Sequence, residues 1–147
     1  MLADDGNKDQ LAKGFGIAEK ELLGDIAIYP RQARCRSQLA LIYCFAGVKY
    51  KEALVFAQQA KDYDPKVGDS ILGFCYEKNG YYDLAIETYK KALSINSIDL
   101  DSWWRLGVVL QRQGRHEEAI GAWKTGLKID PNYRFILKEM KSSEGHG

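Results

Sequence analysis

Apolar residues recur with helical spacing in paired segments along the second half of the chain. In Leu100–Arg112 the apolar positions lie about three to four residues apart, which predicts an amphipathic helix, and Gly114 interrupts the pattern. A second segment with this spacing runs over His116–Ile129, and Pro131 cannot continue it. The pattern therefore predicts two helices joined by a short turn at a glycine.

The same two-helix arrangement recurs towards the N-terminus. One copy lies about 34 residues earlier, and another lies about the same distance before that. The matching positions are Leu106, Gly107, Gly114 and Ala119 in the last copy, Leu72, Gly73, Gly80 and Ala85 in the middle copy, and Leu39, Ala40, Gly47 and Ala53 in the first. The small residues let two helix backbones approach closely, while bulky neighbours fill the space beside the contact.

The two ends of the chain depart from this unit. Residues 13–30 match only the second helix of a unit, through Phe15, Ala18 and Leu22, and they predict a helix over residues 14–29. Residues 1–12 are too polar to supply the missing first helix. After Pro131, residues 132–141 predict a closing helix that covers the end of the stack, and residues 142–147 predict a frayed tail.

The recurring Leu-Gly, Gly and Ala-Ile positions resemble the tetratricopeptide repeat (TPR) family. The resemblance implies an all-α fold, a right-handed α–α superhelix (solenoid) of about three and a half helix-turn-helix units with a C-terminal capping helix. It also implies a single TPR domain over residues 1–147. Its parts are a half repeat over 13–30, repeats over 32–65, 66–97 and 98–131, a capping helix over 132–141 and a tail over 142–147.

Few residues of the chain could carry catalysis. His116 stands in a turn beside a helix start and His146 stands in the tail, and neither forms part of a recognisable catalytic set. Glu117 and Glu118 follow that helix start, where acidic residues complement the helix dipole. The chain has 3 cysteines without CxxC spacing, which fits neither a disulfide framework nor a zinc site. We therefore expect no enzymatic activity, no metal and no cofactor.

The charge and hydropathy of the chain exclude some classes of partner and favour one cellular location. A net charge of +1 argues against nucleic acid and against a polybasic membrane role. No apolar run approaches the roughly 18–20 residues needed to cross a bilayer, so we expect membrane association only through partners. The first residues lack the layout of a signal peptide, and unpaired cysteines suit a reducing compartment. These features favour a cytoplasmic chain.

The resemblance also implies a partner-binding surface, because the first helix of each TPR unit lines the concave face. The exposed side of these helices, at spacings of i, i+3, i+4 and i+7, is predicted to contact the partner. It comprises Arg34, Leu41, Phe45, Phe74, Lys78, Trp104, Arg105, Val108 and Arg112. Large apolar groups along a groove mark binding sites, and Trp and Arg are frequent interface anchors. For Leu41 and Phe74, burial against a neighbouring unit is an equal alternative.

The leading hypothesis is a non-catalytic protein–protein interaction module that binds a peptide or protein segment in its concave groove. The mixture of apolar and cationic residues favours a partner with apolar and acidic residues. The alternative is a self-assembling TPR scaffold, for example of the organelle-surface, magnetosome-associated type. It follows from the helix over residues 14–29, whose apolar face has no partner helix in its own unit, so that another copy of the chain could cover it.

Overall fold

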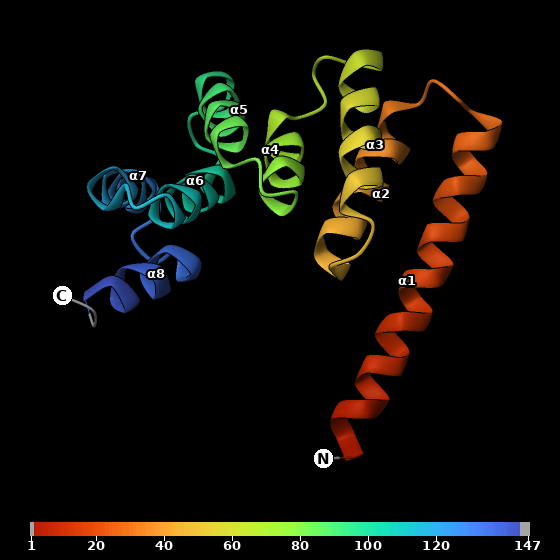
Figure 1. The fold of residues 1–147 in the computed structure, drawn as a ribbon, viewed down its shortest axis with the longest axis horizontal. Helices are drawn as coiled ribbons and strands as arrows, with labels where there is room; N and C mark the ends of the chain where they lie inside the picture. Colours follow the sequence, from red (N-terminus) through yellow and green to blue (C-terminus); the bar gives the residue numbers. More distant parts are fainter. Residues whose placement is uncertain (1, 145–147) are drawn as a thin grey trace. The chain divides into compact units, whose positions relative to one another are not determined.

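The computed structural model describes residues 2–144, with side chains described from residue 6, and over this range it contains eight α-helices and no strand (Figure 1). The chain divides into two compact units, residues 1–67 with the first three helices and residues 68–147 with the other five. The helices are α1 (Leu2–Ile28), α2 (Ala33–Ala46), α3 (Tyr50–Tyr63), α4 (Asp69–Lys78), α5 (Tyr82–Ile95), α6 (Leu100–Arg112), α7 (His116–Ile129) and α8 (Arg134–Glu144). The prediction of an all-α fold is confirmed.

Glycines end the first helix of the pairs α4–α5 and α6–α7. Gly80 has φ of 81° and Gly114 has φ of 77°, the left-handed region that a residue without a Cβ adopts at low cost. The turn between α2 and α3 also contains Lys49, which has a positive φ of 50° and accommodates one extra residue. The helices of each pair therefore begin and end where the sequence places the breaks, and α6 and α7 have the predicted bounds.

In the second unit the helices approach closely at the glycines of the repeat. A Cβ added to Gly107 would clash with the indole of Trp123, and one added to Gly73 would lie 2.9 Å from the ring of Tyr89. Trp123 is fully buried, and its Nε1 donates to the backbone oxygen of Trp104 at 3.1 Å. The aromatic rings of α5 and α7 therefore lie directly against the backbones of α4 and α6.

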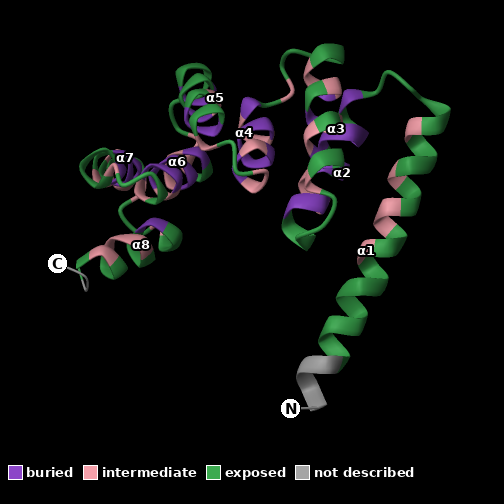
Figure 2. Ribbon diagram, viewed as in Figure 1, coloured by how far each residue is buried: buried purple, intermediate pink, exposed green. Residues whose placement is uncertain are grey.

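The first unit contains one helix that is much longer than predicted. α1 begins at Leu2, so the expected start near residue 14 is wrong: residues 2–12 extend this helix and do not form a separate partner for it. α1 packs against α2, where the rings of Phe15 and Tyr43 lie 6.1 Å apart, and Lys49 donates to Glu19 at 3.0 Å. From residue 6 to residue 14 every residue is exposed, as Figure 2 shows along the N-terminal part of α1.

A closing helix is present at the C-terminal end of the repeats, as predicted. α8 packs against α7 and α6, and its Ile136 is fully buried. The helix continues through residues 142–144, which corrects the expectation of a frayed tail for these three residues. Residues 145–147, including His146, lie outside the described residues.

Candidate partner-binding surface

A row of stacked aromatic and cationic side chains crosses α4, α6 and α8 in the second unit. The rings of Phe135 and Trp104 lie 4.7 Å apart with an interplanar angle of 25°. The guanidinium carbon of Arg105 lies 4.8 Å from the ring centroid of Trp104 and 3.8 Å from that of Phe74. The Nζ of Lys78 lies 5.4 Å from the ring centroid of Phe74. These five residues are called the stacking row below.

The predicted contact residues of this unit differ in their exposure. Arg105 is only 8% exposed, so the expectation that it presents an open side chain is wrong. Phe74 is only 3% exposed, which agrees with the alternative of burial that the sequence left open for it. Both are buried because each covers a face of the other. Lys78, Trp104 and Val108 are half-buried and Arg112 is exposed, so these four remain accessible to a partner.

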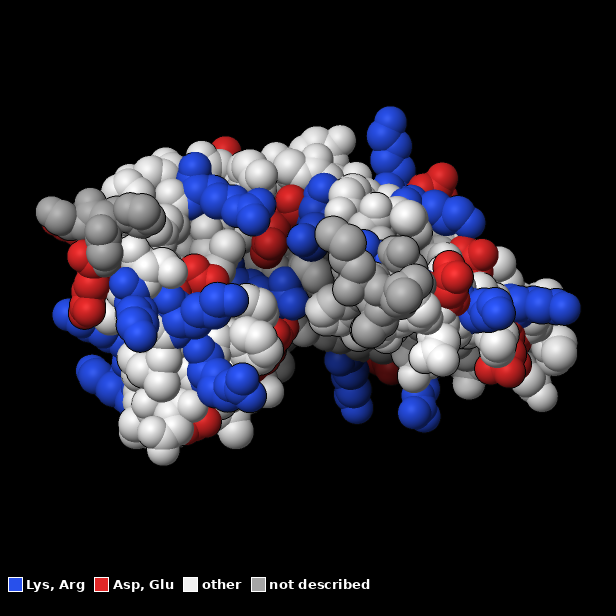
Figure 3. All heavy atoms as spheres, turned by 90° about the horizontal axis from the view of Figure 1, so that it is seen from below, with Lys and Arg blue, Asp and Glu red and all other residues white. Residues whose placement is uncertain are grey.

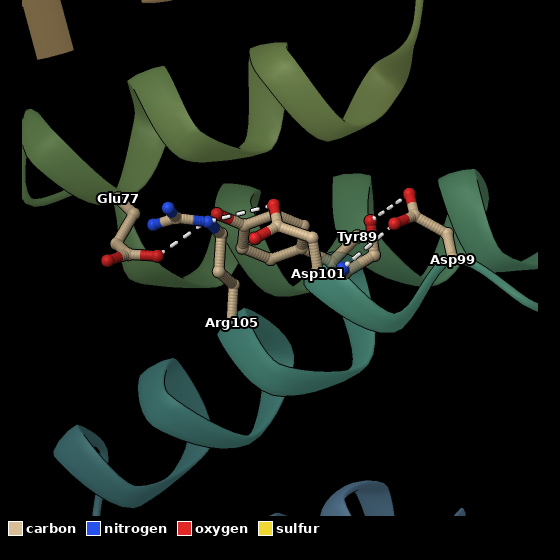
Figure 4. Close-up of polar contacts among 6 residues, drawn as sticks. Glu77, Tyr89, Asp99, Asp101 and Arg105 are labelled. Atoms are coloured by element: carbon tan, nitrogen blue, oxygen red, sulfur yellow. Dashed lines mark hydrogen bonds and ion pairs between the residues drawn. The ribbon is translucent and has the colours of Figure 1, made fainter. Parts of the chain in front are cut away.

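Arg105 is held in place by a polar cluster of the buried Glu77, Tyr89 and Arg105 and the exposed Asp101 (Figure 4). Its Nε donates to Asp101 Oδ2 at 3.0 Å, and its guanidinium lies between Asp101 and Glu77. The hydroxyl of Tyr89 donates to Glu77 Oε1 at 3.0 Å. Burial raises the pKa of Glu77, although the hydrogen bond from Tyr89 and the positive charge of Arg105 oppose the shift. The cluster therefore fixes the orientation of Arg105 within the stacking row.

α8 contributes two residues that the sequence analysis missed. Phe135 stacks on Trp104, and Glu139 accepts a hydrogen bond from Trp104 Nε1 at 3.4 Å. Phe135 nevertheless remains 53% exposed. The two residues stand four apart and therefore on one face of α8, which is the only signal in the sequence that they act together. The closing helix thus covers part of Trp104, while the ring of Phe135 that stacks on it is itself exposed.

The other three predicted contact residues lie on α2, in the first unit. Arg34 and Phe45 are exposed and Leu41 is half-buried. Leu41 lines a groove between α1 and α2 with a volume of about 370 Å³, together with Ala18, Glu21, Leu22, Asp25, Gln38 and Ile42. The predicted set therefore divides into an α2 group in one unit and a group around the stacking row in the other.

The histidines, cysteines and carboxylates of the described residues form no metal-binding group, because no three or more of these side chains are placed together to hold a metal ion. Cys35, Cys44 and Cys75 are all buried and unbridged, and His116 is exposed at the start of α7. Figure 3 shows acidic and basic side chains interspersed over the face that it draws.

None of the helices, over the residues that the structure describes, combines the length and the apolar character that a membrane span requires.

Helix pairs with this packing define a helical-repeat protein, and the comparisons with known proteins agree. One family model described as TPR repeat matches residues 73–114, and another described as tetratricopeptide repeat matches residues 100–133. Residues 73–133 therefore match tetratricopeptide repeats, as the sequence predicted. TPR units serve as modules for protein–protein interaction.

Two curated relatives match part of the chain. The general transcriptional corepressor ssn6 of Schizosaccharomyces pombe is 34% identical over 88 residues, 57% of this chain and 8% of the relative. The peroxisomal targeting signal receptor of Candida albicans is 36% identical over 76 residues, 52% of this chain and 12% of the relative. The chain therefore spans only a small part of the length of these relatives.

Solved structures with the same fold match more of the chain. A crystal structure of MamA superposes with a TM-score of 0.73 at 21% identity, over 87% of this chain and 75% of that one. The Cut9–Hcn1 hetero-tetramer of APC/C gives a TM-score of 0.80 at 19% identity, over 93% of this chain and 28% of that one. These structures confirm an all-α helical-repeat superhelix.

Proposed function

We propose that the chain is a non-catalytic interaction module that binds a peptide or protein segment at the stacking row. The observation that carries the proposal is the pair of Trp104 and Phe135, two stacked rings of which one is half-buried and the other is 53% exposed. Adjoining exposed apolar groups mark binding sites, and aromatic residues dominate interface energetics. Val108, one turn along α6 from Trp104, extends the apolar part of the surface.

The cations beside these rings indicate the chemistry of the partner. Lys78 and Arg112 are accessible at the edge of the row, whereas Arg105 is already engaged by Asp101. A partner segment with apolar side chains for the rings and carboxylates for Lys78 and Arg112 fits this arrangement. Because both cations are partly solvated, their contribution is expected to fall as the salt concentration rises.

Quantitative affinity capture tests this proposal. Trp104→Ala and Arg112→Ala should each reduce recovery of the proteins that the wild type captures, and Trp104→Ala should reduce it more. Lys124→Ala, which removes an exposed cation from α7, is the matched control. If both variants recover the same proteins as the wild type in the same amounts, the stacking row is not the binding surface.

A self-assembling scaffold is a second candidate, and the outer face of α1 favours it. Ile17 is 61% exposed and Ile28 is 67% exposed, and both border a hollow on α1. A second copy of the chain could cover this face. Light scattering decides the matter: a chain that remains monomeric at high concentration, with α1 ordered, contradicts the scaffold.

The proposal includes a cytoplasmic location and the repeat boundaries. Three buried cysteines without a disulfide support a reducing compartment. The divisions at residues 32–65, 66–97 and 98–131, with a half repeat over 13–30, form part of the same proposal.

A further inference from the structure

The helix pairs of the second unit provide a template for the first. In the second unit α4 packs against both α5 and α6, and so fills the position between the second helix of one pair and the first helix of the next. By the register of the repeat, Ala18, Leu22 and Ile26 of α1 correspond to Ala85, Tyr89 and Leu93 of α5. α1 and α2 therefore correspond to α5 and α6, and the described residues of the first unit include no helix that corresponds to α4.

The groove between α1 and α2 lies where that helix would pack. Ala85, Tyr89 and Leu93 are all buried under α4 and α6, whereas Ala18, Leu22 and Ile26 are only half-buried. Leu41 and Ile42 of α2, also half-buried, complete the apolar floor of the groove. The floor thus presents apolar side chains from two helices, the surface against which an amphipathic helix packs.

The rim of the groove is acidic on the α1 side. Glu21 and Asp25, four residues apart on one face of α1, border the groove, and the neutral Gln38 borders it on α2. Both carboxylates are exposed, and within residues 6–144 their side chains form no ion pair or hydrogen bond. A helix with cationic side chains along the same edge would pair with them.

The N-terminal residues of the chain are poorly suited to this groove. If residues 2–12 folded back into it, Asp5 and Asp9 would take the positions at which α4 carries Leu72 and Tyr76. Leu72 is buried in its own unit, and a carboxylate at such a position loses its hydration without gaining a partner. The same segment from a second copy carries the same aspartates, and both would also face the acidic rim.

We propose that the α1–α2 groove binds a basic amphipathic helix of another protein. The helix takes the place that α4 occupies in the second unit. Its apolar side chains, spaced i, i+3, i+4 and i+7, pack on Leu22, Leu41 and Ile42, and its Lys or Arg side chains pair with Glu21 and Asp25. This site is separate from the stacking row. It prefers a basic partner, whereas the stacking row prefers an acidic one.

Titration calorimetry with two synthetic peptides tests the proposal on the full chain. Each peptide is an Ala-rich helix of about 15 residues, a length at which isolated helices become populated, with leucines at the stated spacing. One carries lysines beside the leucines and the other carries glutamates. The wild-type chain should bind the lysine peptide. The variant Glu21→Lys/Asp25→Lys should bind the lysine peptide about tenfold more weakly and should bind the glutamate peptide instead. Leu41→Ala should weaken both interactions.

The control is Glu52→Lys/Asp62→Lys, which reverses two exposed carboxylates of α3 and changes the net charge equally. It should leave binding of the lysine peptide within about twofold of the wild type. The proposal is overturned if the control variant weakens binding as much as the groove variant, or if the wild type binds neither peptide. It is also overturned if the lysine peptide binds only after residues 2–12 are deleted, because the groove then belongs to the chain's own segment. Trp104→Ala should not change this affinity, so the outcome is independent of the stacking row.

Discussion

Both units of the chain pair a buried tyrosine with a glutamate, but the two glutamates are perturbed in opposite directions. In the second unit Glu77 is 6% exposed, accepts from Tyr89, and has a pKa that burial raises. In the first unit Glu19 is half-buried, and hydrogen bonds from Lys49 and then Tyr43 lower its pKa. Burial, together with the neighbouring Glu19, raises the pKa of Tyr43 to about 12.

The difference follows from the number of helices that surround each pair. Glu77 lies on α4, which packs against both α5 and α6, so water is excluded from its carboxylate. Glu19 lies on α1, whose described contacts are with α2 alone, so a flexible lysine and water both reach it. The neighbouring helices therefore decide whether the charge of such a glutamate is desolvated or paired.

The largest expected effect concerns Gly107, where two helices of the second unit approach closely. Gly107→Ala places a methyl group in the indole of Trp123 and should destabilise the second unit by about 3 kcal/mol in urea unfolding. Gly121→Ala is the control, because a Cβ there meets nothing within 4 Å, and it should be neutral or stabilising. The first unit carries Ala40 at the position of Gly107, so a Cβ is accommodated at this position there. Equal stability of the two variants would contradict the described packing of Trp123.

A smaller loss of stability is expected when either of the two tyrosines, Tyr89 or Tyr43, loses its hydroxyl. Tyr89→Phe removes the donor to Glu77 and leaves a buried carboxylate with one partner fewer, which should cost about 2 kcal/mol. Tyr43→Phe should cost less, because Lys49 still donates to Glu19. Urea unfolding of both variants measures the difference. A cost for Tyr43→Phe as large as that for Tyr89→Phe would mean that the two pairs are equally desolvated.

Gly14→Ala should strengthen the exposed part of α1. No atom lies within 4 Å of a Cβ at Gly14, so the substitution introduces no clash and removes a helix-interior glycine worth about 1 kcal/mol. Amide hydrogen exchange of residues 6–14 should slow, while exchange in α6 and α7 should not change. Faster exchange would indicate that the glycine serves a bend that α1 adopts in solution.

The smallest expected effect is a difference in pH dependence. Because the pKa of Glu77 is raised above its ordinary 4.5 in the folded state, its contribution to stability is greatest below that value and is lost as the pH rises through the folded pKa. Because the pKa of Glu19 is lowered, its contribution is present above 4.5 and is lost as the pH falls through the folded pKa. Glu77→Gln and Glu19→Gln should therefore change the slope of unfolding free energy against pH in opposite directions. Slopes that change in the same direction would contradict this.

The sequence predicted the second unit better than the first. Gly114 and Pro131 give α6 and α7 their predicted bounds, because a left-handed glycine and a proline act locally on the backbone. The N-terminal part of α1 was missed because its residues are polar, and polarity excludes a buried helix without excluding an exposed one. Burial of Arg105 was missed and that of Phe74 was left open, since both depend on a contact between α4 and α6 that helical spacing does not encode.

The candidate site was predicted only in part for the same reason. Trp104 was found because the neighbouring Trp103 already takes the core position of the repeat. Phe135 and Glu139 were not found, because their role depends on where the closing helix packs. The α1–α2 groove is open because the half repeat has no first helix. The polarity of residues 1–12 indicated that this helix is missing, but it did not show which surface is left uncovered.

The placement of the tryptophans has a spectroscopic consequence. Trp103, Trp104 and Trp123 all lie in the second unit, and the first unit contains none. Intrinsic indole fluorescence therefore reports the second unit alone, whereas far-ultraviolet circular dichroism reports the helices of both. The offset between the two unfolding curves, recorded on the unmodified chain, measures how far the stabilities of the two units differ.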